Sequence, residues 1–107
     1  MCDPELLTVL HLRWRECALC GGTAYTVGRL SLHHISKHPR DDVEGNLVML
    51  CGDGTRGCHG LIEAHDLNKQ RELAGCLRVS RPDAIAYLDA TFPQEGADAW
   101  LQRVLRG

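Results

Sequence analysis

The stretch NLVMLCGDGTRGCHG, residues 46–60, carries the clearest local signals in this chain of 107 residues. The segment from Asn46 to Leu50, apolar after its first residue, predicts a buried strand. Three glycines in residues 52–57 predict a tight turn, and the pattern from Cys58 to Leu73 predicts a helix. Residues 52–57 also match the G-x-G-x-x-G pattern of dinucleotide-binding folds, but no second parallel strand with a suitably placed acidic residue follows. The stretch therefore predicts a strand, a turn and a helix.

Two pairs of cysteines belong to this unit and to the segment before it. Cys17 and Cys20 have the spacing of a zinc knuckle, and Cys51 and Cys58 bracket the glycine-rich turn. Four thiolates from two segments can close a tetrahedral shell, so we expect them to bind a structural Zn²⁺. A thiol redox pair would leave the second pair without a role, and a disulfide framework would need an oxidising compartment.

The remaining segments predict an α+β fold. A helix is expected over residues 3–15, a strand over residues 25–34, and a polar loop over residues 36–45. Ser80, Arg81 and Pro82 open a helix that runs to about Thr91, and a last helix is expected over residues 94–106. We expect a single domain, residues 1–107, with a core at about 13–74 and a C-terminal helical extension at about 80–106.

Composition restricts the function only loosely. The formal net charge is −2, which is no global signature of nucleic-acid binding. A local patch exists, because the segment from Arg29 to Arg40 holds three positive charges and no acidic residue. No apolar run reaches the length of a membrane span, and Met1 to Glu5 lack a positive charge, so we expect a soluble, cytoplasmic protein with no membrane partner.

Three histidines lie at the ends of the predicted strands and helix. His33 and His34 end the strand predicted before the loop, Asn46 begins the next strand, and His59 follows Cys58 at the start of the helix. Neighbouring side chains on a strand point to opposite faces, so His33 and His34 can divide two roles. Any one of these histidines alone would be a core or surface residue, but the set together indicates a site.

In this order the residues resemble the HNH endonuclease family (His-Me finger, ββα-metal nucleases). The resemblance is strongest to the small zinc-containing HNH proteins encoded by phages and prophages. It is carried by the segments at residues 17–20, 32–35, 46–52 and 57–60. It covers about residues 13–74 and leaves out the N-terminal helix and the last thirty or so residues.

The resemblance implies a ββα-metal (HNH) core with a four-cysteine zinc site, flanked by an N-terminal helix and C-terminal helices. His34 would be the general base, and His33 and His59 would bind a catalytic divalent cation such as Mg²⁺, Mn²⁺, Ni²⁺ or Zn²⁺. Asn46 would hold the loop so that His34 is correctly aimed. A neutral imidazole can accept a proton from water at physiological pH.

Glu63 departs from the family pattern, because several relatives carry a histidine at this place. It follows His59 by four residues, so both side chains face the same side of the helix. A carboxylate would be a third ligand and would suit a harder cation such as Mg²⁺ or Mn²⁺. The alternative is a solvated glutamate in the first turns of a helix. The other histidines are expected at the surface: His11, His38 and His65.

The expected function is metal-dependent cleavage of DNA, by nicking or by a double-strand cut, leaving 5′-phosphate and 3′-hydroxyl ends. The resemblance also implies phage or prophage DNA processing or packaging in the host cytoplasm, with terminase or another phage protein as a partner. One alternative is a zinc-stabilised module that binds nucleic acid or protein without catalysis. Another is a thiol redox protein, which would carry no stoichiometric zinc and would not depend on His34.

Overall fold

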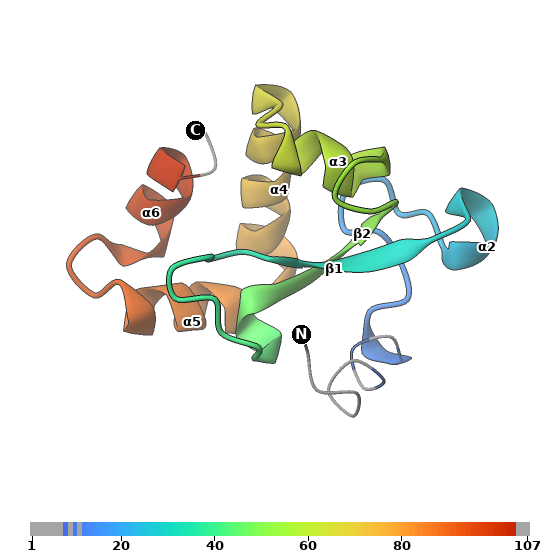
Figure 1. Cartoon of the computed structure of the whole chain (residues 1–107). Coiled ribbons are helices and arrows are strands. Elements are labelled where there is room, and N and C mark those ends of the chain that lie inside the picture. Colours follow the sequence, from blue (N-terminus) through green and yellow to red (C-terminus); the bar gives the residue numbers. More distant parts are fainter. Residues whose placement is uncertain (1–7, 9, 11, 105–107) are drawn as a thin grey trace.

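A computed structural model of the chain describes residues 8, 10 and 12–104 (Figure 1). A two-stranded antiparallel sheet lies beside a set of helices, which confirms the predicted α+β class. The elements follow in the order α2 (Ala24–Val27), β1 (Leu30–His34), the 3-10 turn η1 (Glu44–Asn46), β2 (Leu47–Cys51), α3 (Gly57–Glu63), α4 (Leu67–Ser80), α5 (Pro82–Thr91) and α6 (Gly96–Val104).

The hairpin of β1 and β2 organises the site. Leu30 pairs with Cys51 and His34 pairs with Leu47, so the end of β1 lies beside the start of β2. All five residues of β2 are buried, as the apolar run predicts. The side chains on one face, including Val48 and Leu50, join the main core, which makes β2 the rigid base on which the histidines of β1 are held.

The main core lies between the hairpin and the helices. Leu73 and Leu77 of α4 and Leu88 of α5 are fully buried in it. Trp100 and Leu101 bring α6 onto the same cluster. In Figure 1, α3 and α4 follow the hairpin directly, and α5 lies beside the turn that precedes β2. The predicted C-terminal helices therefore complete the core of the hairpin.

The turn between β2 and α3 needs glycine at two positions. Gly52 has φ 82° and Gly57 has φ 67°, a region in which side chains with a Cβ are strained. A Cβ at Gly52 would also lie 2.1 Å from the carbonyl oxygen of Arg56. The glycines of the G-x-G-x-x-G pattern therefore shape the turn that joins Cys51 to Cys58.

Four predicted boundaries are wrong. Residues 25–27 form the short helix α2 instead of strand, and Gly28 ends it with φ 84°. Asn46 belongs to η1, with the strand beginning at Leu47. The helix expected over residues 58–73 is two helices, because His65 adopts φ 61° and the Asp66 side chain caps α4 by accepting from the Lys69 N–H. The second of them continues to Ser80, which was expected to open the next helix, so α5 begins at Pro82 after the N-cap Arg81.

The helix expected over residues 3–15 falls mostly outside the described residues. Within them, the N–H of Trp14 donates to the carbonyl of Leu10 over 2.7 Å, an i→i−4 bond. No helix in the described part of the chain is long and apolar enough to cross a membrane.

Candidate metal centres

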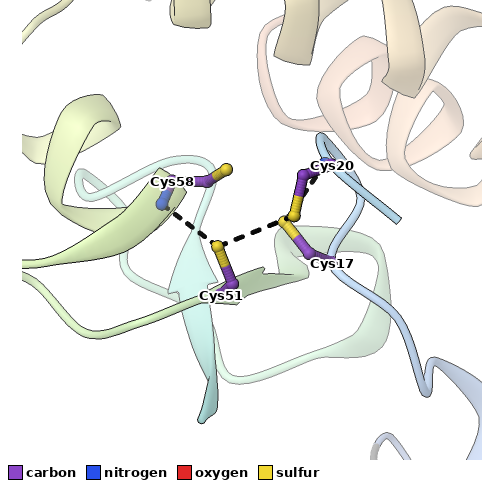
Figure 2. A group of neighbouring side chains, drawn as sticks. All are labelled: Cys17, Cys20, Cys51 and Cys58. Carbon is purple, nitrogen blue, oxygen red and sulfur yellow. Dashed lines mark hydrogen bonds between the residues drawn. The ribbon is translucent and has the colours of Figure 1, made fainter. Parts of the chain in front are cut away.

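The four predicted zinc ligands lie together. The sulfur atoms of Cys17, Cys20, Cys51 and Cys58 are all within 4.8 Å of one another (Figure 2). A tetrahedral thiolate site with metal–sulfur bonds of about 2.3 Å separates its sulfurs by about 3.8 Å. The Sγ atoms of Cys20 and Cys51 are 3.8 Å apart. The cluster could therefore hold a structural metal ion.

Backbone N–H groups near Cys17 favour its thiolate. Burial raises the pKa of Cys17, but backbone N–H groups of Cys20, Cys51 and Leu19 outweigh it and bring that pKa down to about 7. Burial and the neighbouring sulfurs of Cys51 and Cys17 raise the pKa of Cys58 instead. Four crowded thiols cannot all ionise unless a cation offsets their repulsion, so this donor set fits a bound metal.

The four cysteines come from two segments, residues 17–20 and the turn between β2 and α3. The N–H of Ala18 in the knuckle donates to the carbonyl of Met49 in β2 over 2.9 Å, and the Cys58 N–H lies 3.3 Å from Cys51 Sγ. A metal ion here would fasten residues 17–20 to the turn between β2 and α3. Cys76 is outside the cluster, where its thiol donates to the carbonyl of Ala18, and Cys2 lies outside the described residues.

A second group of possible ligands lies between β1 and α3. Donor atoms of His33, His59 and Glu63 are all within 4.8 Å of one another. His33 Nδ1 lies 3.0 Å from Glu63 Oε1, and His59 Nε2 lies 3.5 Å from the same oxygen. The structure therefore brings Glu63 to both histidines. The i,i+4 spacing on α3 places Glu63 beside His59, and the strand places His33 opposite them.

The protonation of this group suits metal binding. Burial lowers the pKa of His33 and of His59, so both imidazoles are neutral at physiological pH. The hydrogen bond from His33, helped by Lys37, lowers the pKa of Glu63, so its carboxylate stays ionised. Two neutral imidazoles and one carboxylate form a donor set that could hold a divalent cation.

Hydrogen bonds also select the free nitrogen of each ring. The Ser31 hydroxyl donates to the Gly52 carbonyl over 2.8 Å, so its contact with His59 Nδ1 at 2.6 Å requires that nitrogen to be the donor. His33 Nδ1 donates to Glu63, and the buried Nε2 of His33 has no hydrogen-bond partner among the described residues. His59 thus keeps a lone pair on Nε2, which lies 3.5 Å from Glu63 Oε1, whereas in His33 the nitrogen that faces this oxygen is Nδ1.

His34 is outside this group. It is the last residue of β1, and its Nε2 lies 2.6 Å from Asp42 Oδ1 in the loop that follows. The side chain of His34 is only 8% exposed, whereas that of Asp42 is 35% exposed. The two adjacent histidines of β1 therefore have different carboxylate partners, Glu63 for His33 and Asp42 for His34.

Asn46 is fully buried and holds the loop between the strands closed. Its Oδ1 accepts from the Ser36 N–H over 2.7 Å, and its Nδ2 donates to the carbonyls of Ser36 and Asp41. Because Ser36 follows β1 closely and Asp41 precedes Asp42, one side chain ties down both ends of the segment around His34 and its partner.

Three contacts near these histidines were not predicted from the sequence. Asp42 contacts His34, Ser31 contacts His59, and Lys37 Nζ lies 2.6 Å from Glu63 Oε1. Ser31 stands two residues before His33 on β1, so strand alternation could have placed it on the same face. The contacts of Asp42 and Lys37 depend on the path of the loop, which carries no periodic signal.

The surface residues behave as expected where they are described. His38 and His65 are exposed, as are Arg29, Lys37 and Arg40 of the predicted basic patch; His11 lies outside the described residues. Comparisons with protein-family models, with curated proteins and with solved structures found no match. The resemblance to HNH nucleases therefore rests on the sequence motifs alone.

Proposed function

We propose that the chain is a metal-dependent DNA endonuclease of the HNH type. The observation that carries this proposal is the convergence of His33, His59 and Glu63 between a hairpin and the helix that follows it. His34, beside this group on β1, is the proposed general base. The proposed Zn²⁺ at the four cysteines is structural and holds the turn from which α3 starts.

A divalent cation bound at the histidine group would supply a Lewis acid that stabilises negative charge on a phosphodiester. The residues of the chain do the rest. Asp42 accepts the Nε2–H of His34, which leaves Nδ1 of that ring to take a proton from water. Asn46 keeps the loop that carries Asp42 closed, and Lys37 adds a positive charge beside Glu63.

The exposed cations near the hairpin support contact with DNA. Arg29 precedes β1, while Lys37 and Arg40 follow it. Such side chains contact phosphates and position a duplex without reading its sequence. Because the net charge of the chain is −2, we expect weak, salt-sensitive binding that depends on this patch.

Nicking of supercoiled plasmid tests the proposal. Wild type, His34→Ala and a control, Glu72→Gln on the exposed side of α4, are compared with Mg²⁺, Mn²⁺ and Ni²⁺. We expect His34→Ala to lower the rate about 10²- to 10⁴-fold, because a general base contributes that much, and the control to cut normally. Equal cutting by all three proteins would reject His34 as the base. No cutting by zinc-loaded wild type would favour the binding module instead.

A further inference from the structure

A pocket of about 360 Å³ opens directly beside the histidine group and shares His33 and Glu63 with it. A larger cavity of about 610 Å³ is lined mainly by residues 13–21, and none of the candidate catalytic residues lines it. The smaller volume is within the range of small-molecule sites, about 300–1,000 Å³. The reacting phosphate of a substrate at the histidine group would therefore lie at the entrance of this pocket.

The walls of the pocket are aromatic and aliphatic. Phe92 and Trp100 stack with their ring centres 5.0 Å apart and their planes 19° from parallel. Ile35 and Ile62 also line it. Trp100 is buried, whereas Phe92 is half-buried. Flat aromatic surfaces of this kind accept any nucleobase, because every base has a π-face.

The polar groups of the pocket suit a nucleotide. Lys37 and Arg103 give positive charge to the lining, and Glu63 is the one carboxylate among the lining residues. Lys37 is bonded to that carboxylate, and Arg103 is an exposed side chain bonded to Glu95. Cations beside an apolar slot allow a base to enter while its phosphates stay outside.

The pocket also contains an unsatisfied hydrogen-bond acceptor. Gln70 is 2% exposed and lines the pocket; its Nε2 contacts His65, but its Oε1 has no partner among the described residues. Buried polar atoms without partners are rare, so such an atom in a pocket wall indicates a ligand that donates a hydrogen bond. Each nucleobase carries an N–H donor on its Watson–Crick edge.

We propose that this pocket binds one unstacked nucleobase of the DNA strand whose phosphate lies at His33, His59 and Glu63. The base stacks beside Phe92 and donates to Gln70. This inference rests on the proposed nuclease function and adds a subsite to it. It makes the enzyme favour single-stranded, mismatched or unwound DNA, because unpairing a base is least costly there.

Nuclear magnetic resonance with deoxynucleosides tests the pocket without requiring catalysis. The chain has two tryptophans. Trp100 lies in the pocket wall, and the Trp14 indole, bonded to Glu44, lines the other cavity. Titrating deoxyadenosine or thymidine, with no divalent cation added to the zinc-loaded protein, should shift the Trp100 indole signal and leave that of Trp14 in place. Deoxyribose should shift neither.

A matched pair of variants tests the stacking. Phe92→Leu keeps an apolar side chain and should weaken the nucleoside affinity about tenfold, the size of one lost stacking contact. Tyr25→Leu removes a fully exposed ring from α2, outside the pocket, and should leave the affinity unchanged. Equal affinities of Phe92→Leu and wild type would overturn the proposal, as would an unmoved Trp100 signal or equal shifts of both tryptophans.

The outcomes separate the two proposals. Plasmid nicking without a Trp100 response would overturn the base pocket and leave the nuclease intact. A Trp100 response in a protein that does not nick would support a nucleoside pocket and overturn the nuclease. If both hold, an oligonucleotide with one abasic position should be cut at an altered rate when that position lies beside the scissile phosphate.

Discussion

His34 Nε2 lies 2.6 Å from Asp42 Oδ1, across eight residues of sequence. The contact joins the last residue of a strand to a loop that Asn46 also holds. A carboxylate bonded to one nitrogen of an imidazole selects the tautomer and the ring orientation. In the proposed reaction this contact therefore makes Asp42 a positioning residue for His34.

Asp42→Asn tests this role. The amide keeps the size of the side chain but cannot hold the imidazole as a carboxylate does, so we expect nicking to fall about 10- to 100-fold, as for partners that orient metal-site histidines. Asp41→Asn is the matched control, because the Asp41 side chain accepts from Tyr87 and does not contact His34. Unfolding midpoints of both variants should stay near that of wild type. Equal nicking by the two variants would reject Asp42 as a partner in the reaction.

Cys58→Ser tests the proposed zinc site. Structural zinc contributes about 10 kcal/mol or more of apparent binding free energy in small modules, so losing one ligand should severely lower the melting temperature and the zinc content. Cys76→Ser, outside the cluster, should keep both. Thermal unfolding gives the melting temperatures of the two proteins, and metal analysis gives their zinc content. An unchanged melting temperature for Cys58→Ser would refute the proposed structural zinc site.

Glu63→Gln tests the second metal centre. The carboxylate is its one anionic donor, so the amide should weaken Mn²⁺ binding about tenfold or more while the structural zinc stays bound. Glu72→Gln, whose side chain contacts Lys69 on α4, should bind Mn²⁺ as wild type does. Titration calorimetry on the zinc-loaded proteins gives both affinities. Identical Mn²⁺ affinities would remove Glu63 from the ligand set.

Asn46→Ala should loosen the loop between the strands. The variant leaves the buried N–H and carbonyl of Ser36 without their partner, and each unsatisfied buried group costs about 1–3 kcal/mol. It also removes the bond to the Asp41 carbonyl. We expect urea unfolding at a clearly lower midpoint, together with faster proteolysis between residues 36 and 45. Asn68→Ala, on the exposed side of α4, is the control. Equal unfolding midpoints for the two variants would contradict the proposal that Asn46 holds this loop in place.

The pair of Arg81 and Asp83 predicts a pH dependence of stability. Burial raises the pKa of Asp83, but the hydrogen bond from Arg81 outweighs it and leaves that pKa below its usual value. A lowered folded-state pKa stabilises the protein above the unfolded pKa, near 4, and this contribution is lost as the pH falls through the folded value.

Asp83→Asn should therefore lower the melting temperature at pH 7 and reduce its fall on acidification below about pH 4. Arg81 is buried against Trp14, so the variant leaves its guanidinium without its carboxylate partner. Asp98→Asn, which breaks an exposed pair with Arg78, should change little. Parallel melting curves of Asp83→Asn and wild type across the acidic range would contradict the assignment.

Local patterns in the sequence were sufficient to predict several secondary-structure elements and the cysteine cluster. The apolar run before Cys51 predicted β2, and Pro82 predicted the start of α5. The spacing of Cys17 and Cys20 with that of Cys51 and Cys58 predicted one cluster of four sulfurs. These features depend on neighbouring residues alone, because periodicity, capping and ligand spacing are properties of short segments.

The tertiary structure decided which polar groups meet. The helical pattern continued past Ala64, and only the left-handed backbone of His65 divides it into α3 and α4. The contact between His33 and Glu63 joins residues thirty positions apart in the sequence. The partner of His34 depends on the path of an irregular loop. No local propensity encodes such contacts, because they arise when packing of the hairpin against the helices brings distant segments together. The sequence by itself therefore determined the candidate ligands and their elements, and the packing of those elements decided which of the two histidines faces Glu63 and which faces Asp42.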